Sequence, residues 1–144
     1  MLKILGKRSS INVRKVLWTC DEVGLTYQQE DYGSGFQPVD TAEFRALNPN
    51  ALVPVLLDDD FVLWESNSIC RYLTRKAGRE DLLPVTPQGA ADIERWMDWQ
   101  ATEFNNAWRY AFMGLVRKDP RFQDPAAMKE SIAAWTRCVQ IVES

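Results

Sequence analysis

Short blocks of apolar residues separated by polar turns fill about the first eighty positions and predict a compact mixed α/β unit. Residues Leu2 to Leu5 are mostly apolar and stop at Gly6, which predicts a first strand. Apolar residues then recur at helical spacing up to a glycine, the residue that commonly ends helices. These are Val13, Val16, Leu17, Cys20 and Val23, followed by Gly24. Residues 27–32 predict a second strand, whose polar alternation indicates the edge of a sheet.

The next stretch predicts a short helix and a hairpin. Asp40-Thr41-Ala42-Glu43 has the pattern of a capping box, and the helix should run through Leu47 and stop before Pro49. Two short apolar runs follow, and the first begins at Pro54 because proline cannot donate to the middle of a sheet. The acidic run over residues 58–60 predicts a tight turn between these two strands.

A further helix should open at Ser66 and end at Gly78, with Ile69, Tyr72 and Leu73 on its apolar face. Serine is a favoured N-cap, and the free N–H groups of a helix start suit a carboxylate ligand. The predicted element order is therefore βαβαββα, which is a thioredoxin-like arrangement.

The start of the first helix is the leading candidate for chemistry. Thioredoxin and glutaredoxin relatives carry Cys-x-x-Cys there, whereas this chain has Ser10-Ile11-Asn12-Val13, so any reactive thiol must come from a ligand. A hydroxyl at Ser10 can donate to a thiolate and lower its pKa, although the residues alone favour an ordinary N-cap at this position. The amide of Asn12 can donate to sulfur or bond its own backbone, and Ser9 adjoins both.

The second half of the chain predicts helices alone. We expect a thioredoxin-like domain over 1–78, a charged linker over 79–88 and an all-α part over 89–144. A helix should begin at Thr86-Pro87 and run to about Lys118, and another should begin at Asp124-Pro125. Their apolar faces comprise Ile93, Trp96, Met97, Gln100, Phe104, Ala107, Trp108, Ala111, Phe112 and Leu115 on the first, and Met128, Ile132, Trp135, Val139 and Val142 on the second.

Composition excludes several classes of function. The 144 residues carry a formal net charge of −3, and no stripe of lysine and arginine is present to neutralise nucleic-acid phosphates. The chain becomes charged too early for a secretory signal, and no apolar run approaches the length of a membrane span. We therefore expect a soluble cytoplasmic protein that contacts neither nucleic acid nor membrane.

The residues that usually bind metals or attack substrates are scarce. Histidine is absent, which removes histidine-dependent triads, the usual zinc chemistry and a histidine general base. Cys20, Cys70 and Cys138 are far apart, lack metal-ligand spacing and lie among apolar neighbours in predicted helices. We expect buried, inert thiols and no metal site.

One ordered set of motifs resembles a known family. Val53-Pro54, the predicted hairpin and Glu65-Ser66 follow one another as in the glutathione-binding half of the soluble, cytosolic glutathione S-transferases of bacteria. The resemblance extends from Leu2 to the helices after residue 88. It implies a cis bond between Val53 and Pro54, whose backbone pairs with the cysteinyl part of glutathione. It also implies that Glu65 holds the γ-glutamyl ammonium and Ser66 the carboxylate.

The resemblance gives Ser10 and Asn12 roles at the glutathione sulfur. In serine-type transferases the serine donates to the thiolate, and in a bacterial subgroup that includes nu-like disulfide reductases an asparagine two residues later also faces the sulfur. Many relatives carry lysine or glutamine immediately before Val-Pro for the glycine carboxylate, where this chain has Leu52. Asn50, Arg8 or a loop residue near Gln37 is the candidate replacement.

The resemblance also implies a second-substrate wall late on the first long helix, formed by Trp108, Arg109 and Phe112. The transferases continue through several more helices, so we expect a chain that is C-terminally short relative to the family. The face bearing Trp135 and Val139 should then lack cover and favour a homodimer.

Three functions remain after these observations. The first is a glutathione S-transferase that uses glutathione as co-substrate, without a metal, and joins its thiolate to a small electrophile. The second is a nu-like, glutathione-dependent reductase of disulfides or peroxides. The third is a non-catalytic transferase-like binding module, which the residue at Leu52 favours.

Overall fold

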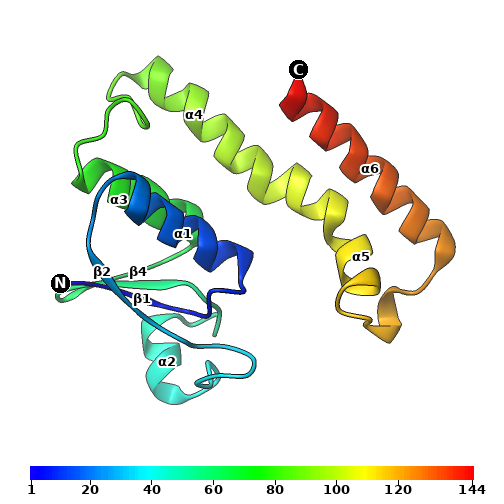
Figure 1. The fold of residues 1–144 in the computed structure, drawn as a ribbon, viewed down its shortest axis with the longest axis horizontal. Helices are drawn as coiled ribbons and strands as arrows, with labels where there is room; N and C mark the ends of the chain where they lie inside the picture. The colour runs from blue at the N-terminus through cyan, green and yellow to red at the C-terminus, as the bar shows by residue number, and fades with distance from the viewer. The chain divides into compact units, whose positions relative to one another are not determined.

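The computed structural model describes residues 1–144 and divides them into two compact units, residues 1–89 and 90–144 (Figure 1). The predicted linker over 79–88 lies at the end of the first unit. The first unit holds a four-stranded sheet flanked by helices, and the second holds helices alone. None of the helices combines the length and the apolar character that a membrane-spanning segment needs.

The first unit confirms the predicted order βαβαββα. Its elements are β1 (Leu2–Leu5), α1 (Ile11–Glu22), β2 (Tyr27–Glu30), α2 (Ala42–Leu47), β3 (Val55–Asp58), β4 (Phe61–Trp64) and α3 (Ser66–Lys76). The strands lie in the order β2-β1-β3-β4, so β2 is an edge strand, as its polar alternation predicts. β1 pairs parallel to β2 and antiparallel to β3, and β3 and β4 form the predicted hairpin. This is the thioredoxin-like fold expected from the sequence.

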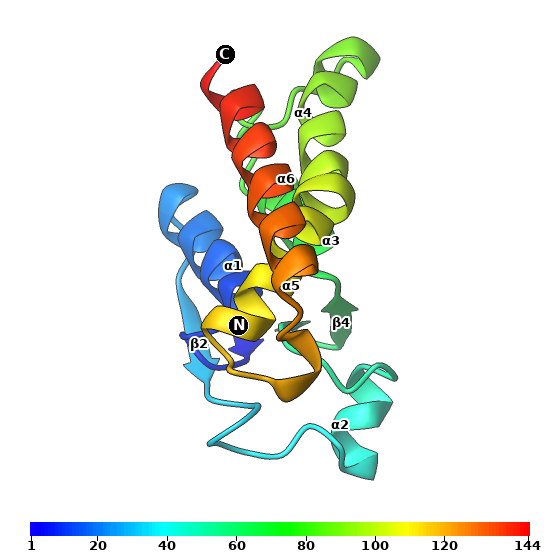
Figure 2. The ribbon, with the colours of Figure 1, turned by 90° about the vertical axis from the view of Figure 1, so that its right-hand side faces the viewer.

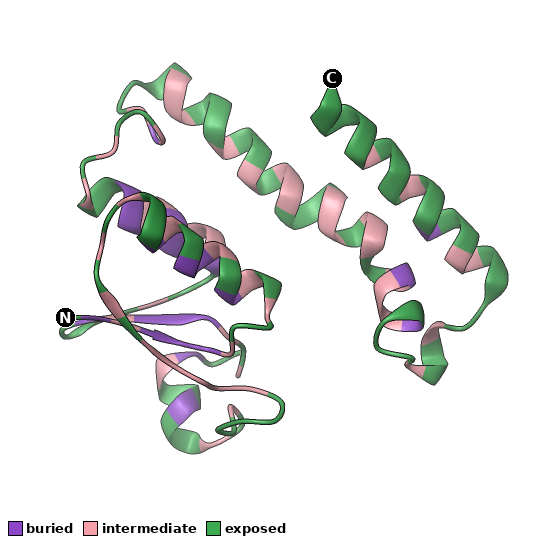
Figure 3. Cartoon of the chain, viewed as in Figure 1, coloured by how far each residue is buried: buried purple, intermediate pink, exposed green.

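Helices cover both faces of the sheet: α1 and α3 lie side by side on one face and α2 lies on the other (Figures 1 and 2). Side chains alternate between the faces along a strand. Leu5 and Val55 pack with Phe44 of α2, so Ile4 and Leu56 face α1 and α3. All five side chains are buried, and Figure 3 shows that most buried positions belong to this unit.

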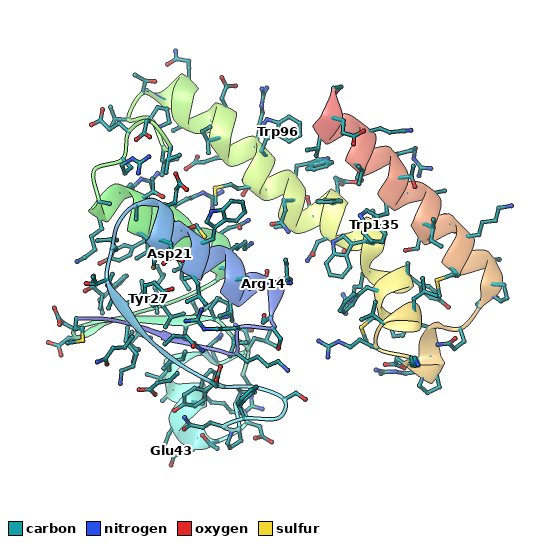
Figure 4. All side chains as sticks on the ribbon, viewed as in Figure 1. Arg14, Asp21, Tyr27, Glu43, Trp96 and Trp135 are labelled. Atoms are coloured by element: carbon teal, nitrogen blue, oxygen red, sulfur yellow. The ribbon has the colours of Figure 1, made fainter.

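The end of α1 is fixed by both backbone and side chains. Gly24 has a φ of 72°, the left-handed conformation that glycine adopts after helices, as predicted. The Tyr27 hydroxyl donates to the Asp21 carboxylate at 3.2 Å (Figure 4). Arg79 donates to the Glu22 carbonyl at 2.8 Å, which ties the chain after α3 to the last residue of α1.

The predicted helix caps are partly wrong. Thr41, and not Asp40, is the N-cap of α2 and accepts a backbone hydrogen bond. Ser10 occupies the N-cap position of α1, but its hydroxyl makes no capping bond. The N-cap of α3 is Glu65, so Ser66 is already helical and is not the cap that the sequence predicts. The N-cap is the last residue with a non-helical backbone, and contacts from the rest of the unit decide which residue that is.

The second unit contains two helical stretches, but the first is not the single α-helix that the spacing predicts. A π-helical turn interrupts it, and it ends before the predicted Lys118. The elements are α4 (Pro87–Trp99), the π turn η1 (Gln100–Phe104), α5 (Asn105–Leu115), the 3₁₀ turn η2 (Pro120–Phe122) and α6 (Pro125–Glu143). Asp124 caps α6 by accepting from the Ala127 amide, as predicted.

The packing of α5 on α6 includes a polar bridge. The Ser131 hydroxyl of α6 donates to the Ala107 carbonyl at 2.6 Å and accepts from the Ala111 amide at 3.1 Å. Ser131 therefore serves a donor and an acceptor that lie four residues apart on α5, and it is itself buried. Gly114 of α5 is also buried, and a Cβ built on it would lie 2.3 Å from the Phe122 carbonyl oxygen.

Most of the predicted apolar face of α6 is exposed, although Met128 is half-buried. Trp135, Val139 and Val142 keep 41%, 38% and 61% of their surface accessible. On α4, Trp96 is also exposed (Trp96 and Trp135 are labelled in Figure 4). Exposed apolar area of this extent favours association with another surface.

Candidate functional site

The start of α1 presents two polar side chains. The backbone of Ser10 is extended, with φ of −75° and ψ of 127°, and its carbonyl accepts from the Arg14 amide at 2.9 Å. Because the hydroxyl makes no capping bond, Ser10 is not committed to the helix as an ordinary N-cap would be. Asn12 is half-buried in the first turn, and Ser9 is exposed.

Gly6 is the point at which α1 approaches the loop before β3. A Cβ built on Gly6 would lie 2.5 Å from Val13 Cγ2 and 3.0 Å from Val53 Cβ. The φ of Gly6 is 146°, a conformation that side-chain-bearing residues rarely adopt. The bond between Val53 and Pro54 is cis, as the resemblance implies. The first turn of α1 and the cis-proline loop therefore lie together.

The loop before Val53 is organised by a buried asparagine. Asn48 donates from Nδ2 to the Leu52 carbonyl at 2.8 Å, and its Oδ1 accepts from both nitrogens of Asn50 at 3.0 Å. The side chain of Leu52 is exposed. Arg8 donates to Gln29 Oε1 at 3.2 Å. None of these contacts selects one replacement for the polar residue that many relatives carry at this place.

Glu65 connects β4 to α3 with an unusual backbone. Its φ is 73° and its ψ is 108°, a conformation that costs a residue other than glycine about 1–3 kcal/mol. The next residue, Ser66, is 7% exposed, and its hydroxyl donates to Asn12 Oδ1 at 3.4 Å. This contact joins residues 54 positions apart. The predicted sites for a thiol and for a carboxylate are therefore neighbours.

Two more side-chain hydrogen bonds connect α1 to α3. Lys15 Nζ donates to Asn67 Oδ1 at 2.5 Å, and Thr19 Oγ1 donates to Cys70 Sγ at 3.2 Å. The residues of this polar seam are Asn12, Lys15 and Thr19 on α1, with Ser66, Asn67 and Cys70 on α3. Lys15, Thr19 and Asn67 are not among the residues predicted from the sequence. The signal was the recurrence of polar residues at positions 12, 15 and 19, which lie on one side of the helix.

Burial controls the titration of several groups near the seam. Burial lowers the pKa of the Lys15 ammonium, and the neighbouring Cys70 and Glu65 oppose this shift. Burial raises the pKa of the Cys70 thiol and raises that of Cys20 to about 12. Both thiols stay protonated at neutral pH and are poor nucleophiles. Cys138 of α6 is half-buried, so the prediction that it is buried was wrong.

The residues predicted to line a second substrate lie on α5 in the second unit. The rings of Trp108 and Phe112 meet edge-on, with centroids 5.2 Å apart, and the Arg117 guanidinium lies 5.5 Å from the Phe112 centroid. Arg109 is exposed. These contacts stabilise α5, and the part of these residues in substrate binding stays a prediction.

Other surface features do not coincide with the predicted site. A hollow on β4 and α3 is lined by residues between Phe61 and Lys76, and none of the predicted site residues lines it. No group of three or more His, Cys, Asp or Glu side chains is placed to hold a metal ion. The candidate site therefore consists of the starts of α1 and α3 and the cis-proline loop.

Comparisons with known proteins agree on one family. The glutathione S-transferase N-terminal domain matches residues 1–75. Glutathione S-transferase GstB of Escherichia coli (strain K12) is 44% identical over 133 residues, which are 91% of this chain and 64% of that protein. The chain thus spans less than two thirds of the length of this relative.

A solved structure and a second relative extend the comparison. The theta class glutathione S-transferase of Xanthomonas axonopodis pv. citri, solved with glutathione bound, is 39% identical with a TM-score of 0.87. That match covers 96% of this chain and 66% of the other. Elongation factor 1-gamma 2 of Oryza sativa subsp. japonica is 34% identical over 99 residues, which are 65% of this chain and 24% of that protein.

Proposed function

The chain belongs to the glutathione S-transferase family, and we propose that its first unit binds glutathione and activates the thiol for attack on a small electrophile. The observation that carries this proposal is the contact between Ser66 and Asn12. This contact supports the proposal because it joins the residue assigned to the γ-glutamyl carboxylate to one assigned to the thiol, near the approach of α1 to the cis-proline loop.

Each end of glutathione has a chemically matched group in this proposal. Glu65 pairs with the γ-glutamyl ammonium, and the N–H of Ser66 holds the carboxylate at the start of α3. The Ser66 hydroxyl has a single proton, which turns from Asn12 Oδ1 to the carboxylate when the ligand binds. The backbone of Val53, before cis-Pro54, pairs with the cysteinyl part of the ligand. For the glycine carboxylate, Asn50, Arg8 and a loop residue near Gln37 remain the candidates.

Thiol activation is assigned to the start of α1. The Ser10 hydroxyl donates to the glutathione sulfur and favours the thiolate, which lowers the pKa of the thiol. Asn12 is the rival donor: its Oδ1 accepts from Ser66, which leaves its amide hydrogens to face a ligand. The thiolate then forms a bond to an electrophilic carbon, and the leaving group departs with the electron pair of the broken bond. The protein contributes activation and positioning and forms no covalent intermediate.

The second substrate and the assembly complete the proposal. Trp108, Arg109 and Phe112 form the wall for the electrophile, and two copies of the chain form a homodimer. The exposed apolar surface of Trp135 and Val139 supports association. Light scattering should give the mass of a dimer, and a monomer mass at all protein concentrations would contradict this part.

Two alternatives compete with conjugation. A glutathione-dependent reductase of disulfides or peroxides would rely on Asn12 more than on Ser10. A non-catalytic module is favoured by the similarity to an elongation factor and by Leu52 in place of a polar residue.

Calorimetry with glutathione tests the binding site. Ser66→Ala should weaken binding about 10- to 100-fold, because a hydrogen bond to a charged group is lost. Ser68→Ala on the same helix is the matched control and should bind as the wild type does. Absence of binding by the wild-type chain would refute the proposal and favour the non-catalytic module.

Turnover of a model electrophile separates the two thiol donors. Ser10→Ala should lower kcat/KM and shift its pH profile upward by about one to two pH units, since each unit corresponds to 1.36 kcal/mol. The same change in Asn12→Ala alone would favour the nu-like account. Full activity in both variants and in the double variant would contradict both assignments.

A further inference from the structure

We propose that Lys15 is a positioning residue that holds the first turn of α3 in the conformation needed to bind glutathione. The expected effect of Lys15 on glutathione binding rests on the proposed function, but its effect on the conformation of α3 is independent of any ligand. Lys15 lies on α1, opposite Asn67, and not among the residues assigned to glutathione. It would act on the ligand only through α3.

Both the side chain and the backbone of Lys15 contact the start of α3. Its ammonium donates to Asn67 Oδ1 at 2.5 Å. Its backbone carbonyl accepts from the Thr19 hydroxyl at 2.8 Å and from Cys70 Sγ at 3.7 Å. The ammonium also interacts electrostatically with Glu65. Lys15 therefore faces Glu65, Asn67 and Cys70, which span the first turns of α3.

The segment that Lys15 contacts is one that needs support. Glu65 holds a left-handed backbone at the N-cap of α3 without a capping bond from its own side chain. Such a conformation persists only when surrounding structure enforces it. The bond to Asn67 fixes the residue two positions after Glu65, and the positive charge of Lys15 attracts the Glu65 carboxylate. Together they hold Glu65 and Ser66 in register for a ligand.

The partial burial of Lys15 argues against an incidental surface contact. Burial disfavours the charged form and lowers the pKa of its ammonium. An uncharged side chain of similar length would avoid this cost while filling the same space. Lys15→Met therefore tests positioning without opening a cavity, and we expect it to keep the melting temperature of the wild type or to raise it.

Amide hydrogen exchange in the ligand-free protein tests the structural part. The Ile69 amide donates to the Glu65 carbonyl at 2.9 Å and so reports on the first turn of α3. In Lys15→Met, and equally in Asn67→Ala, Ile69 should exchange about ten-fold faster, the effect expected when one side-chain contact is lost. Amides of α6 should be unchanged, as should Ile69 in the control Lys129→Met. Unchanged exchange of Ile69 in both seam variants would overturn the proposal.

Glutathione affinity tests the functional part. Lys15→Met should weaken binding about ten-fold, and the double variant with Asn67→Ala should weaken it little further, because both act through one contact. The pH profile of kcat should not move, since Lys15 does not touch the thiol. Full additivity, or a shifted profile, would overturn the assignment. If the wild type fails to bind glutathione, the proposed function fails, and exchange at Ile69 still decides the role of Lys15.

Discussion

Replacing Gly6 with alanine should destabilise the first unit and weaken ligand binding, because the new methyl group has no space. It would lie 2.5 Å from Val13 Cγ2 and 3.0 Å from Val53 Cβ. Both atoms belong to short, β-branched valine side chains, so neither can move aside as the end of a long side chain can. α1 or the cis-proline loop must move instead.

The magnitude has two parts. A φ of 146° costs alanine about 1–3 kcal/mol, since this region is used almost only by glycine. Overpacking against Val13 and Val53 adds about 1–3 kcal/mol. Gly24→Ala is the matched control: Gly24 also has a positive φ, 72°, but nothing lies within 4 Å of its added Cβ. It should cost only the strain of the left-handed backbone, about 1–2 kcal/mol.

The assay is urea unfolding followed through the NMR amide signals of β1 and β3, which report on the first unit alone. Gly6→Ala should lower its free energy of unfolding by about 2–6 kcal/mol, and Gly24→Ala by about 1–2 kcal/mol. Glutathione affinity should fall in Gly6→Ala, since the cis-proline loop shifts, and stay unchanged in Gly24→Ala. Equal destabilisation by the two substitutions would show that the close contact at Gly6 adds nothing to the loss of stability.

Three further predictions follow from the packing. Hydrogen bonds from Lys76 and Tyr72 hold the pKa of Asp58 below its ordinary 3.8. Above pH 3.8 the wild type should therefore have a larger free energy of unfolding than Asp58→Asn, and this difference should disappear as the pH falls through the lowered pKa. Urea titrations at several pH values measure it. Ser131→Ala should lower the free energy of thermal unfolding by about 1–3 kcal/mol, because the buried Ala111 amide and the half-buried Ala107 carbonyl lose a partner. An unchanged melting temperature would contradict the bridge. Gly114→Ala should lower the free energy of unfolding by about 1–3 kcal/mol or more, since the atom that the new methyl group would meet is a backbone oxygen. Amide hydrogen exchange in α5 at the wild-type rates would refute this.

Local patterns in the sequence were sufficient for the order of elements in the first unit. The spacing of Val13, Val16 and Cys20 predicts α1, and two apolar runs around an acidic turn predict the hairpin. These signals work because helix and strand periods are properties of short segments. The absence of histidine likewise restricted the chemistry without any structure.

The tertiary structure decided which residues meet. The bonds from Ser66 to Asn12 and from Lys15 to Asn67 join residues 54 and 52 positions apart, and no local pattern specifies such a pairing. The same holds for the left-handed backbone of Glu65, which moved the cap of α3 away from Ser66.

In the second unit the sequence predicted two helices but not the π turn between α4 and α5, nor the bridge from Ser131 across to α5. Helical periodicity averages over several turns, so it does not resolve one widened turn. The sequence by itself determined the elements and the kind of chemistry that they can carry. Packing determined the site, because a site is a set of distances between segments far apart in the chain.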